Sequence, residues 1–161
     1  MKETILAAGL LVLAMGVADG ADAQFEARPT PEFAPLVERV CLPLVKGGKV
    51  ADAAGAARTL AFAETARNAS MVTLERNENL SLTVGPAYCY VSLAYSSPSH
   101  FMAVERELRG WLPRLGRYWA GRIDGDVLGM RARKFRAGGI TVTLEEQVDE
   151  YGRRLNMTMT P

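Results

Sequence analysis

Apolar residues recur at helical spacing in three stretches of the chain. The first runs from Glu32 to Gly47-Gly48, and Pro43 is expected to make its last turn irregular. The second covers residues 50–61, where small alanine side chains on one face allow close packing. The third begins at Ser97-Pro98-Ser99, because a serine cap before a proline at the first helical position is a typical helix start. The pattern therefore predicts two N-terminal helices and one central helix.

Elsewhere the hydrophobic period changes from 3.6 to 2, which is typical of half-buried strands. Strands are predicted over residues 71–76, 80–84, 89–95, 117–123, 127–136, 140–149 and 153–160. The order of elements suggests an internal echo, in which helices and three strands are followed by a helix and four strands. We predict a two-layer α+β domain, with an antiparallel sheet of about six to seven strands and the three helices packed on one face.

Turn residues predict how the last strands pair. A two-residue loop at Tyr151-Gly152 puts the apolar residues of both flanking strands on one side of the sheet. The predicted partners are Val148 with Leu155, Leu144 with Met159, and Glu146 with Met157. In the preceding hairpin, Arg131 is expected opposite Glu145.

The first 23 residues have the pattern of a secretory signal peptide. Residues 5–17 form an uncharged apolar run of 13 residues. This is too short for a membrane span, which needs about 20 residues. Ala21-Asp22-Ala23 supplies small residues at the −3 and −1 positions of a cleavage site. We expect cleavage after Ala23 and a periplasmic or secreted location. A cut after Ala18 and a short buried N-terminal helix are the alternatives.

Cleavage would leave residues 24–161 as a single domain of 138 residues, long enough to bury a core. The net charge would rise from +1 to +3, which by itself indicates no class of partner. No second apolar stretch reaches membrane length, so we expect no transmembrane segment in the mature chain. Nucleic-acid binding is disfavoured by the export pattern.

Cys41 and Cys89 are the two cysteines of the chain. An even count in an exported protein indicates a disulfide rather than catalytic thiols. Cys41 lies in a helical pattern and Cys89 in a strand pattern, so the bridge would join a helix to the sheet. Closing a loop of about 49 residues stabilises a fold by roughly 4 kcal/mol. Two separate buried thiols are the alternative.

Two residues have chemistry that suggests a catalytic or ligand-binding role. His100 has nearby serines, but these are explained more simply as turn and cap residues, and we favour a partly exposed place for His100 in the first turn of a helix. Glu146 shares a strand face with apolar residues, where a carboxylate is costly unless it is paired or lines a pocket. Alternatively, the face is open at that end, or an arginine reaches the carboxylate. The spacing of cysteines and histidine matches no metal site, and no phosphate-binding loop or other cofactor motif is present.

The segment 106–136 carries a local excess of six positive charges. Arg131 and Arg133 belong to it, and Trp111, Tyr118 and Trp119 lie in the same stretch. The segment either binds an anionic envelope component or forms a solvated sheet face with cross-strand pairs.

Tyr88 and Tyr90 share the outer face of the Cys89 strand, where they either form an aromatic binding surface or lie under a helix. We favour the helix. No set of catalytic residue types is assembled along the chain. The sequence therefore favours a non-catalytic exported domain that binds another envelope or secreted protein, with Glu146, Arg131, Arg133, Tyr88 and Tyr90 as the candidate contacts. The rivals are a small hydrolase or ligand-processing enzyme around Glu146 or His100, and a binder of anionic envelope components.

Overall fold

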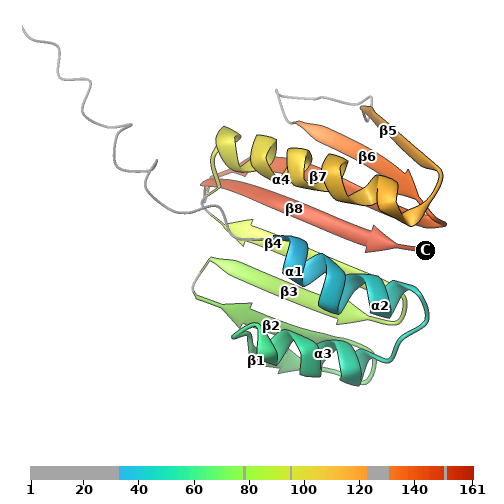
Figure 1. Cartoon of the computed structure of the whole chain (residues 1–161). Coiled ribbons are helices and arrows are strands. Elements are labelled where there is room, and N and C mark those ends of the chain that lie inside the picture. The colour runs from blue at the N-terminus through green and yellow to red at the C-terminus, as the bar shows by residue number, and fades with distance from the viewer. Residues whose placement is uncertain (1–32, 78, 95, 123–130, 151) are drawn as a thin grey trace, which may run out of the picture.

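The computed structural model describes residues 33–77, 79–94, 96–122, 131–150 and 152–161. The expected signal peptide, Tyr95, and the predicted turn at 124–126 lie outside these residues. Helices and four strands form the first half, and a helix and four strands form the second (Figure 1). The first half holds α1 (Phe33–Leu36), η1 (Val37–Cys41), α2 (Leu42–Val45), α3 (Val50–Thr59), β1 (Ala63–Arg67), β2 (Val72–Arg76), β3 (Leu80–Gly85) and β4 (Tyr88–Ala94). The second holds α4 (Pro98–Trp111), η2 (Leu112–Leu115), β5 (Tyr118–Arg122), β6 (Ala132–Ala137), β7 (Ile140–Asp149) and β8 (Gly152–Thr160).

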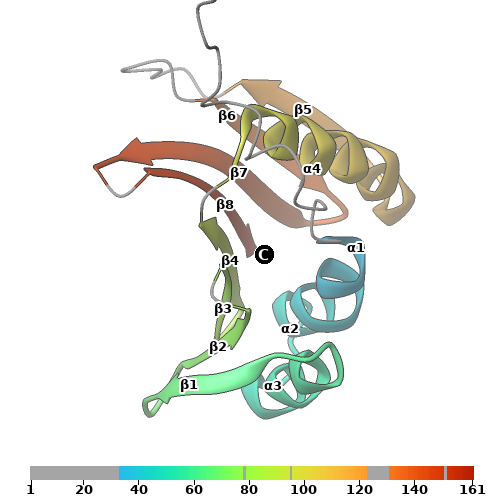
Figure 2. The ribbon, with the colours of Figure 1, turned by 90° about the vertical axis from the view of Figure 1, so that its left-hand side faces the viewer.

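The strands form one antiparallel sheet in the order β1-β2-β3-β4-β8-β7-β6-β5. Figure 2 shows the helices on one side of this curved sheet. The predicted α+β class, with helices on one face, is therefore confirmed. The sheet has eight strands rather than six to seven, because β1 was not predicted. The order is symmetrical about the junction of β4 and β8, so each half is a helical segment followed by a four-stranded meander.

The first helical segment is continuous from α1 to α2 and contains a π-helical turn at η1. The Leu42 N–H donates to the Val37 carbonyl, five residues back. The irregular turn thus precedes Pro43, whereas the sequence predicted it at the end of the helix. Pro43 has no N–H to continue the ordinary hydrogen-bond ladder. The segment ends at Gly47, whose φ of 101° suits glycine.

Cys41 and Cys89 form the predicted disulfide, with an S–S distance of 2.01 Å. Cys41 lies at the end of η1 and Cys89 in β4, so the bridge ties the first helical segment to the middle of the sheet. Both residues are fully buried. The bridge therefore fixes which face of β4 points towards the helices.

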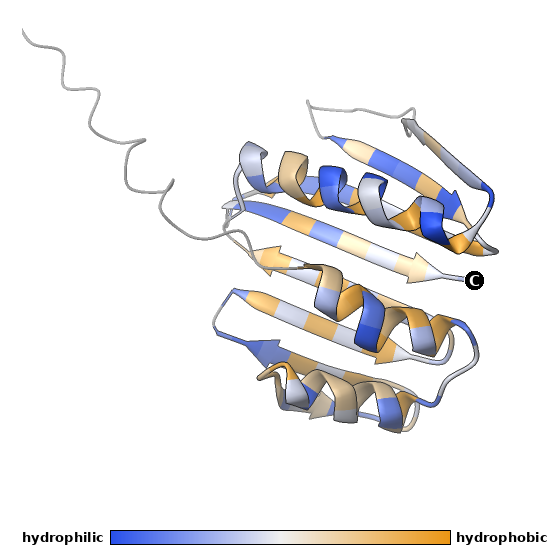
Figure 3. Ribbon diagram, in the orientation of Figure 1, coloured by the Kyte–Doolittle hydropathy of each residue, from blue (hydrophilic) through white to orange (hydrophobic). Residues whose placement is uncertain are grey.

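Alternation of side chains along the strands builds the core. In β3 and β4 every second residue is buried, and the pattern is visible as alternating hydropathy in Figure 3. The same holds for much of β7, where Val142 and Leu144 are fully buried. These strand residues form one buried cluster with Phe33 of α1 and Phe101 of α4. Burial of side chains of this size is the main favourable contribution to folding.

The central helix α4 begins as predicted. Ser97 is its N-cap, and Pro98 follows in the first turn. The Ser97 hydroxyl accepts from the His100 N–H, and His100 Nδ1 accepts from the Ser97 N–H at 3.1 Å. His100 thereby takes the role that glutamate usually has in a capping box.

Two side-chain contacts join the first helical segment to α4. Glu107 Oε1 accepts from the Ala34 N–H at 2.5 Å. Trp111 Nε1 donates to Glu38 Oε1 at 2.6 Å. The helical segments of the two halves are thus connected over the sheet.

The predicted registers of the last two hairpins are wrong, for different reasons. Glu146 pairs with Leu155, because Asp149 pairs with Gly152, which therefore belongs to β8 and not to the connecting loop. This slip of two residues keeps each side chain on its predicted face. Ala132 pairs with Glu145, because Gly138 and Gly139 form a two-residue turn. That slip of one residue moves Arg133 to the helix side of the sheet.

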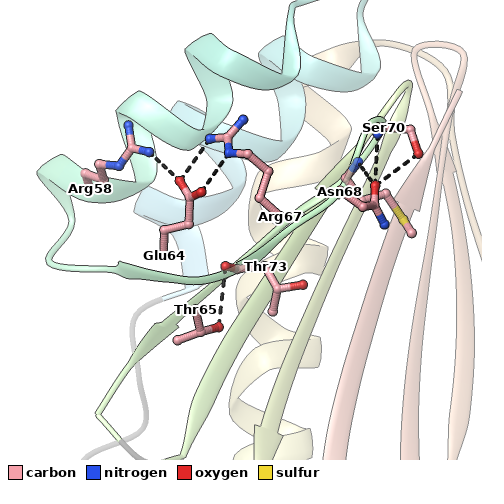
Figure 4. A network of polar contacts seen from close by, with 8 residues as sticks. Arg58, Glu64, Thr65, Arg67, Asn68, Ser70 and Thr73 are labelled. Atoms are coloured by element: carbon pink, nitrogen blue, oxygen red, sulfur yellow. Dashed lines mark hydrogen bonds and ion pairs between the residues drawn. The ribbon is translucent and has the colours of Figure 1, made fainter.

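The edge strand β1 is held by an ion-pair network (Figure 4). Glu64 Oε2 accepts from Arg58 at the end of α3 at 2.5 Å, and Glu64 Oε1 accepts from Arg67 Nε at 2.7 Å. Next to it, Asn68 Oδ1 accepts the N–H groups of Ser70 and Met71 and shapes the turn into β2. All five residues of β1 are exposed. Polar contacts at its end and the backbone ladder therefore hold this strand in place.

We expect the disulfide to contribute about 4 kcal/mol to the free energy of unfolding, because it restricts the unfolded chain. The Cys41→Ala/Cys89→Ala double variant should lose that amount in urea denaturation followed by circular dichroism. The control is Val148→Ala at an exposed strand position, which should change stability by less than about 0.5 kcal/mol. A double variant as stable as the wild type contradicts a stabilising bridge.

The pKa of Glu64 is lowered from 4.5 to about 2, chiefly by the hydrogen bond from Arg67; desolvation opposes this shift, and the Arg58 contact adds to it. Because the folded-state pKa lies below the unfolded one, the stabilisation is present above about pH 4.5 and is lost as the pH falls towards 2. Carboxyl-carbon NMR titration should show the Glu64 pKa rising in Arg67→Gln more than in Arg58→Gln. A pKa near 4.5 in the wild type would refute the network.

Candidate functional site

The face of the sheet away from the helices carries rows of polar side chains, and we call it the open face. Cross-strand partners define its central row, from β2 through β4 and β8 to β6: Thr73, Thr83, Tyr90, Thr158, Thr143 and Lys134. A second row contains Glu75, Ser81, Ser92, Asn156 and Glu145. No helix of the described chain covers this face (Figure 2). The open face is thus a continuous surface rich in hydroxyl groups.

Tyr88 and Tyr90 lie on the open face, and the prediction that they lie under a helix is wrong. Cys89, between them, points to the helices through its disulfide, so its neighbours point the other way. The two rings are parallel within 4°, with centroids 6.4 Å apart. Burial raises the pKa of Tyr88, and Tyr90 contributes further. The pair presents half-buried aromatic surface, and the Tyr88 hydroxyl is uncharged at neutral pH.

A hydrogen-bonded chain of side chains crosses from β4 to β7. Ser92 Oγ donates to Asn156 Oδ1 at 2.8 Å, and Asn156 Nδ2 donates to Gln147 Oε1 at 3.4 Å. Asn156 is only 8% exposed, so these bonds satisfy an amide that is nearly excluded from water. A hollow of about 190 Å³ lies at this end of the open face.

Glu146 is buried on the helix side, as its strand pattern predicted, and is 3% exposed. Arg153 Nη1 donates to Glu146 Oε1 at 2.5 Å from β8. Two residues further along β7, Val148 is 49% exposed. Both alternatives considered from the sequence are therefore present: an arginine reaches the carboxylate, and this face opens at its end.

His100 lies in the first turn of α4, as predicted, but it is buried rather than partly exposed. Its Nδ1 accepts a backbone N–H, so the neutral ring carries its proton on Nε2. In that state neither nitrogen is free to act as a base. The capping role explains why a histidine occurs here.

The arginine-rich segment 106–136 does not form a single patch. Glu105 Oε1 accepts from Arg109 and Arg133, which draws both guanidinium groups to the helix side. Arg131 is exposed, and its carbonyl accepts the Glu146 N–H. Arg136 lies over the ring of Trp119, with 5.8 Å between the guanidinium carbon and the ring centroid. The positive charges of the described residues are therefore divided between the two sides of the sheet.

Sequence reasoning identified the two tyrosines but missed the polar chain around Asn156. Asn156 falls on the polar side of the β8 alternation, between the buried Leu155 and Met157, so its burial leaves no signal in the local pattern. Within the described residues, no group of three His, Cys, Asp or Glu side chains is arranged to hold a metal ion. No helix in the described ranges is long and apolar enough to cross a membrane.

Comparison with protein-family models, curated proteins and solved structures found no match for this chain.

We expect removal of Arg153 to cost more than removal of Glu146. Arg153→Met leaves a buried carboxylate without its partner, at a cost of about 3 kcal/mol. Glu146→Leu leaves Arg153, whose side chain is 34% exposed and can reach water. Urea denaturation of both variants and of the double variant measures the difference. Equal losses, or a double variant less stable than Arg153→Met, contradict a buried ion pair.

Proposed function

We propose that this chain is a non-catalytic binding protein that acts outside the cytoplasm and docks another protein on its open face. The observation that carries the proposal is the position of Tyr88 and Tyr90. Two stacked, half-buried rings stand among hydroxyl-bearing residues on the side of the sheet that the helices leave uncovered. Tyrosine is enriched in protein interfaces, because it offers a large apolar surface together with a polar tip.

The size of the open face supports a protein as the occupant. Strands about 4.8 Å apart and roughly 20 Å long give an eight-stranded face of about 700 Å². Each partner in a stable interface of standard size buries about 800 Å². A protein partner can therefore use most of this surface.

The N-terminal pattern and the disulfide support an extracytoplasmic location. The apolar run at 5–17 and the small-residue box ending at Ala23 are typical of an export signal. The Cys41–Cys89 bridge fits an oxidising compartment. Together they favour a partner in the periplasm or outside the cell.

The contacts of Glu146 and His100 favour binding over catalysis. Glu146 is paired with Arg153, and His100 Nδ1 is used in the helix cap. A general base needs a lone pair within reach of the proton that it removes. Docking of a protein on the open face requires neither residue.

The engagement of Arg109 and Arg133 by Glu105 also favours a protein partner over an anionic envelope component. Binding of such a component relies on exposed positive charge and weakens strongly with salt. The tyrosine surface, by contrast, relies on apolar contact.

Site-specific photocrosslinking in the native host tests the proposal. A photoreactive phenylalanine derivative replaces Tyr90 or Thr143 on the open face, and replaces Met102, an exposed residue of α4, as the control. Intact mass first checks that the recovered chain starts at Gln24. The expected result is one protein adduct of the same mass from Tyr90 and Thr143, absent from Met102 and unchanged in 0.5 M salt.

An adduct from Met102 alone, or none from any position, contradicts docking on the open face. A Tyr88→Ala/Tyr90→Ala variant provides a second readout through the crosslinker at Thr143. Its adduct yield should fall about tenfold, while its melting temperature reports whether the fold is retained. An unchanged yield contradicts the role of the tyrosines.

A further inference from the structure

The hollow at one end of the open face has a small-residue floor and long polar walls. Its volume is about 190 Å³. The described residues that line it are Glu75, Asn77, Asn79, Leu80, Ser81, Ser92, Ala94 and Arg154. Ser81 and Ser92 are cross-strand partners, and Ala94 follows on β4. Their short side chains leave space that the longer neighbours enclose.

The floor of the hollow is held in place before any ligand binds. The Ser92 hydroxyl donates its hydrogen bond to Asn156 Oδ1, so its two lone pairs remain to accept hydrogen bonds from a ligand. The Ala94 N–H donates to the Asn79 carbonyl at 2.7 Å, which fixes the β3 end of the hollow against β4. Preorganised polar groups lower the cost of ordering on binding.

The two charged walls are of opposite sign. Glu75 lies on β2 and Arg154 on β8, three strand spacings apart across the sheet, which is about 14 Å, and two residues apart along the strands. Glu75 would repel an anion, and Arg154 would repel a cation. The remaining polar lining is made of two amides and the Ser81 hydroxyl, which can donate and accept, and the Ser92 hydroxyl, which can accept. The hollow therefore favours a neutral ligand with many hydroxyl groups.

Tyr90 adds an aromatic surface beside the hollow. It lies on the same face as Ser92, two residues along β4, which is about 7 Å. A sugar ring has polar hydroxyl groups at its edge and C–H groups on its faces. The polar lining can form hydrogen bonds with the hydroxyl groups at the edge of the sugar ring, and a tyrosine ring can pack against the C–H groups of one face.

We infer that this hollow binds one neutral sugar residue, with Glu75, Asn77, Asn79, Ser81 and Ser92 as hydrogen-bonding partners. The Glu75 carboxylate accepts from two adjacent hydroxyl groups, since its two oxygens offer about four lone-pair sites. The asparagine amides and serine hydroxyl groups complete the contacts. This inference does not rest on protein docking, since a sugar can occupy the hollow while the rest of the face is free.

Backbone-amide NMR titration of the full mature chain tests the inference. The probes are glucose, galactose, mannose and N-acetylglucosamine, with glycine and inorganic phosphate as the zwitterion and the anion. At least one sugar should shift the amides of Asn79, Ser81 and Ser92 with a millimolar Kd, while Leu108 in α4 stays unchanged. No shift with any of the four sugars at 100 mM, or shifts with glycine or phosphate alone, overturns the inference.

Two variants test the position of the site. Ser81→Leu fills the floor and should abolish the sugar-dependent shifts, and Glu75→Gln should weaken binding about tenfold. Thr141→Leu is the matched control, since it makes a similar change on β7 away from the hollow. Wild-type binding by Ser81→Leu, or equal losses in Ser81→Leu and Thr141→Leu, contradicts the site. Sugar binding without a protein adduct supports this inference and contradicts the proposed function. A protein adduct without sugar binding supports the proposed function and contradicts this inference.

Discussion

The pairing of β4 with β8 is the constraint on which the rest of the structure depends. These strands join the two halves of the chain, and their inner row places Val91 opposite Met157 in the core. The Cys41–Cys89 bridge fixes which face of β4 points towards the helices. Residues that are partners across antiparallel strands lie on the same face, so the strand pairing then determines which residues of every other strand point towards the helices. The outer row of the same pair, Tyr90 opposite Thr158, becomes the middle of the open face. Fold and candidate site therefore follow from one pair of strands.

Much of the fold was predictable, because burial on one face leaves a periodic pattern in the sequence. The helices, seven of the strands, the cap at Ser97 and the disulfide were all expected, and Glu146 was expected to be buried. Strand β1 was missed because its residues are all exposed and carry no apolar alternation. It is held by the backbone ladder and by Arg58 and Arg67 around Glu64, which are contacts between separate segments.

The register of the hairpins and the face of the sheet that the helices cover were harder to predict from the sequence, because they depend on turns and on the packing of distant segments. The Gly138-Gly139 turn shifts β6 by one residue, and this sends Arg133 towards Glu105. The face of Tyr88 and Tyr90 was expected to be covered, since alternation reports that a strand has two faces but not which one the helices choose. The hollow beside Tyr90 combines residues from β2, β3, β4 and β8, and no local pattern brings these together.

The most direct test of the central claim is a map of solvent access in the free protein and in its complex. Relaxation enhancement by a soluble gadolinium chelate, measured by NMR, reports which groups face the solvent. The account predicts strong enhancement at Tyr90, Thr143 and Thr158 in the free chain and protection there once the partner is bound. Met102 on α4 should be enhanced in both states. Protection of Met102 with continued exposure of the Tyr90 row would contradict the account.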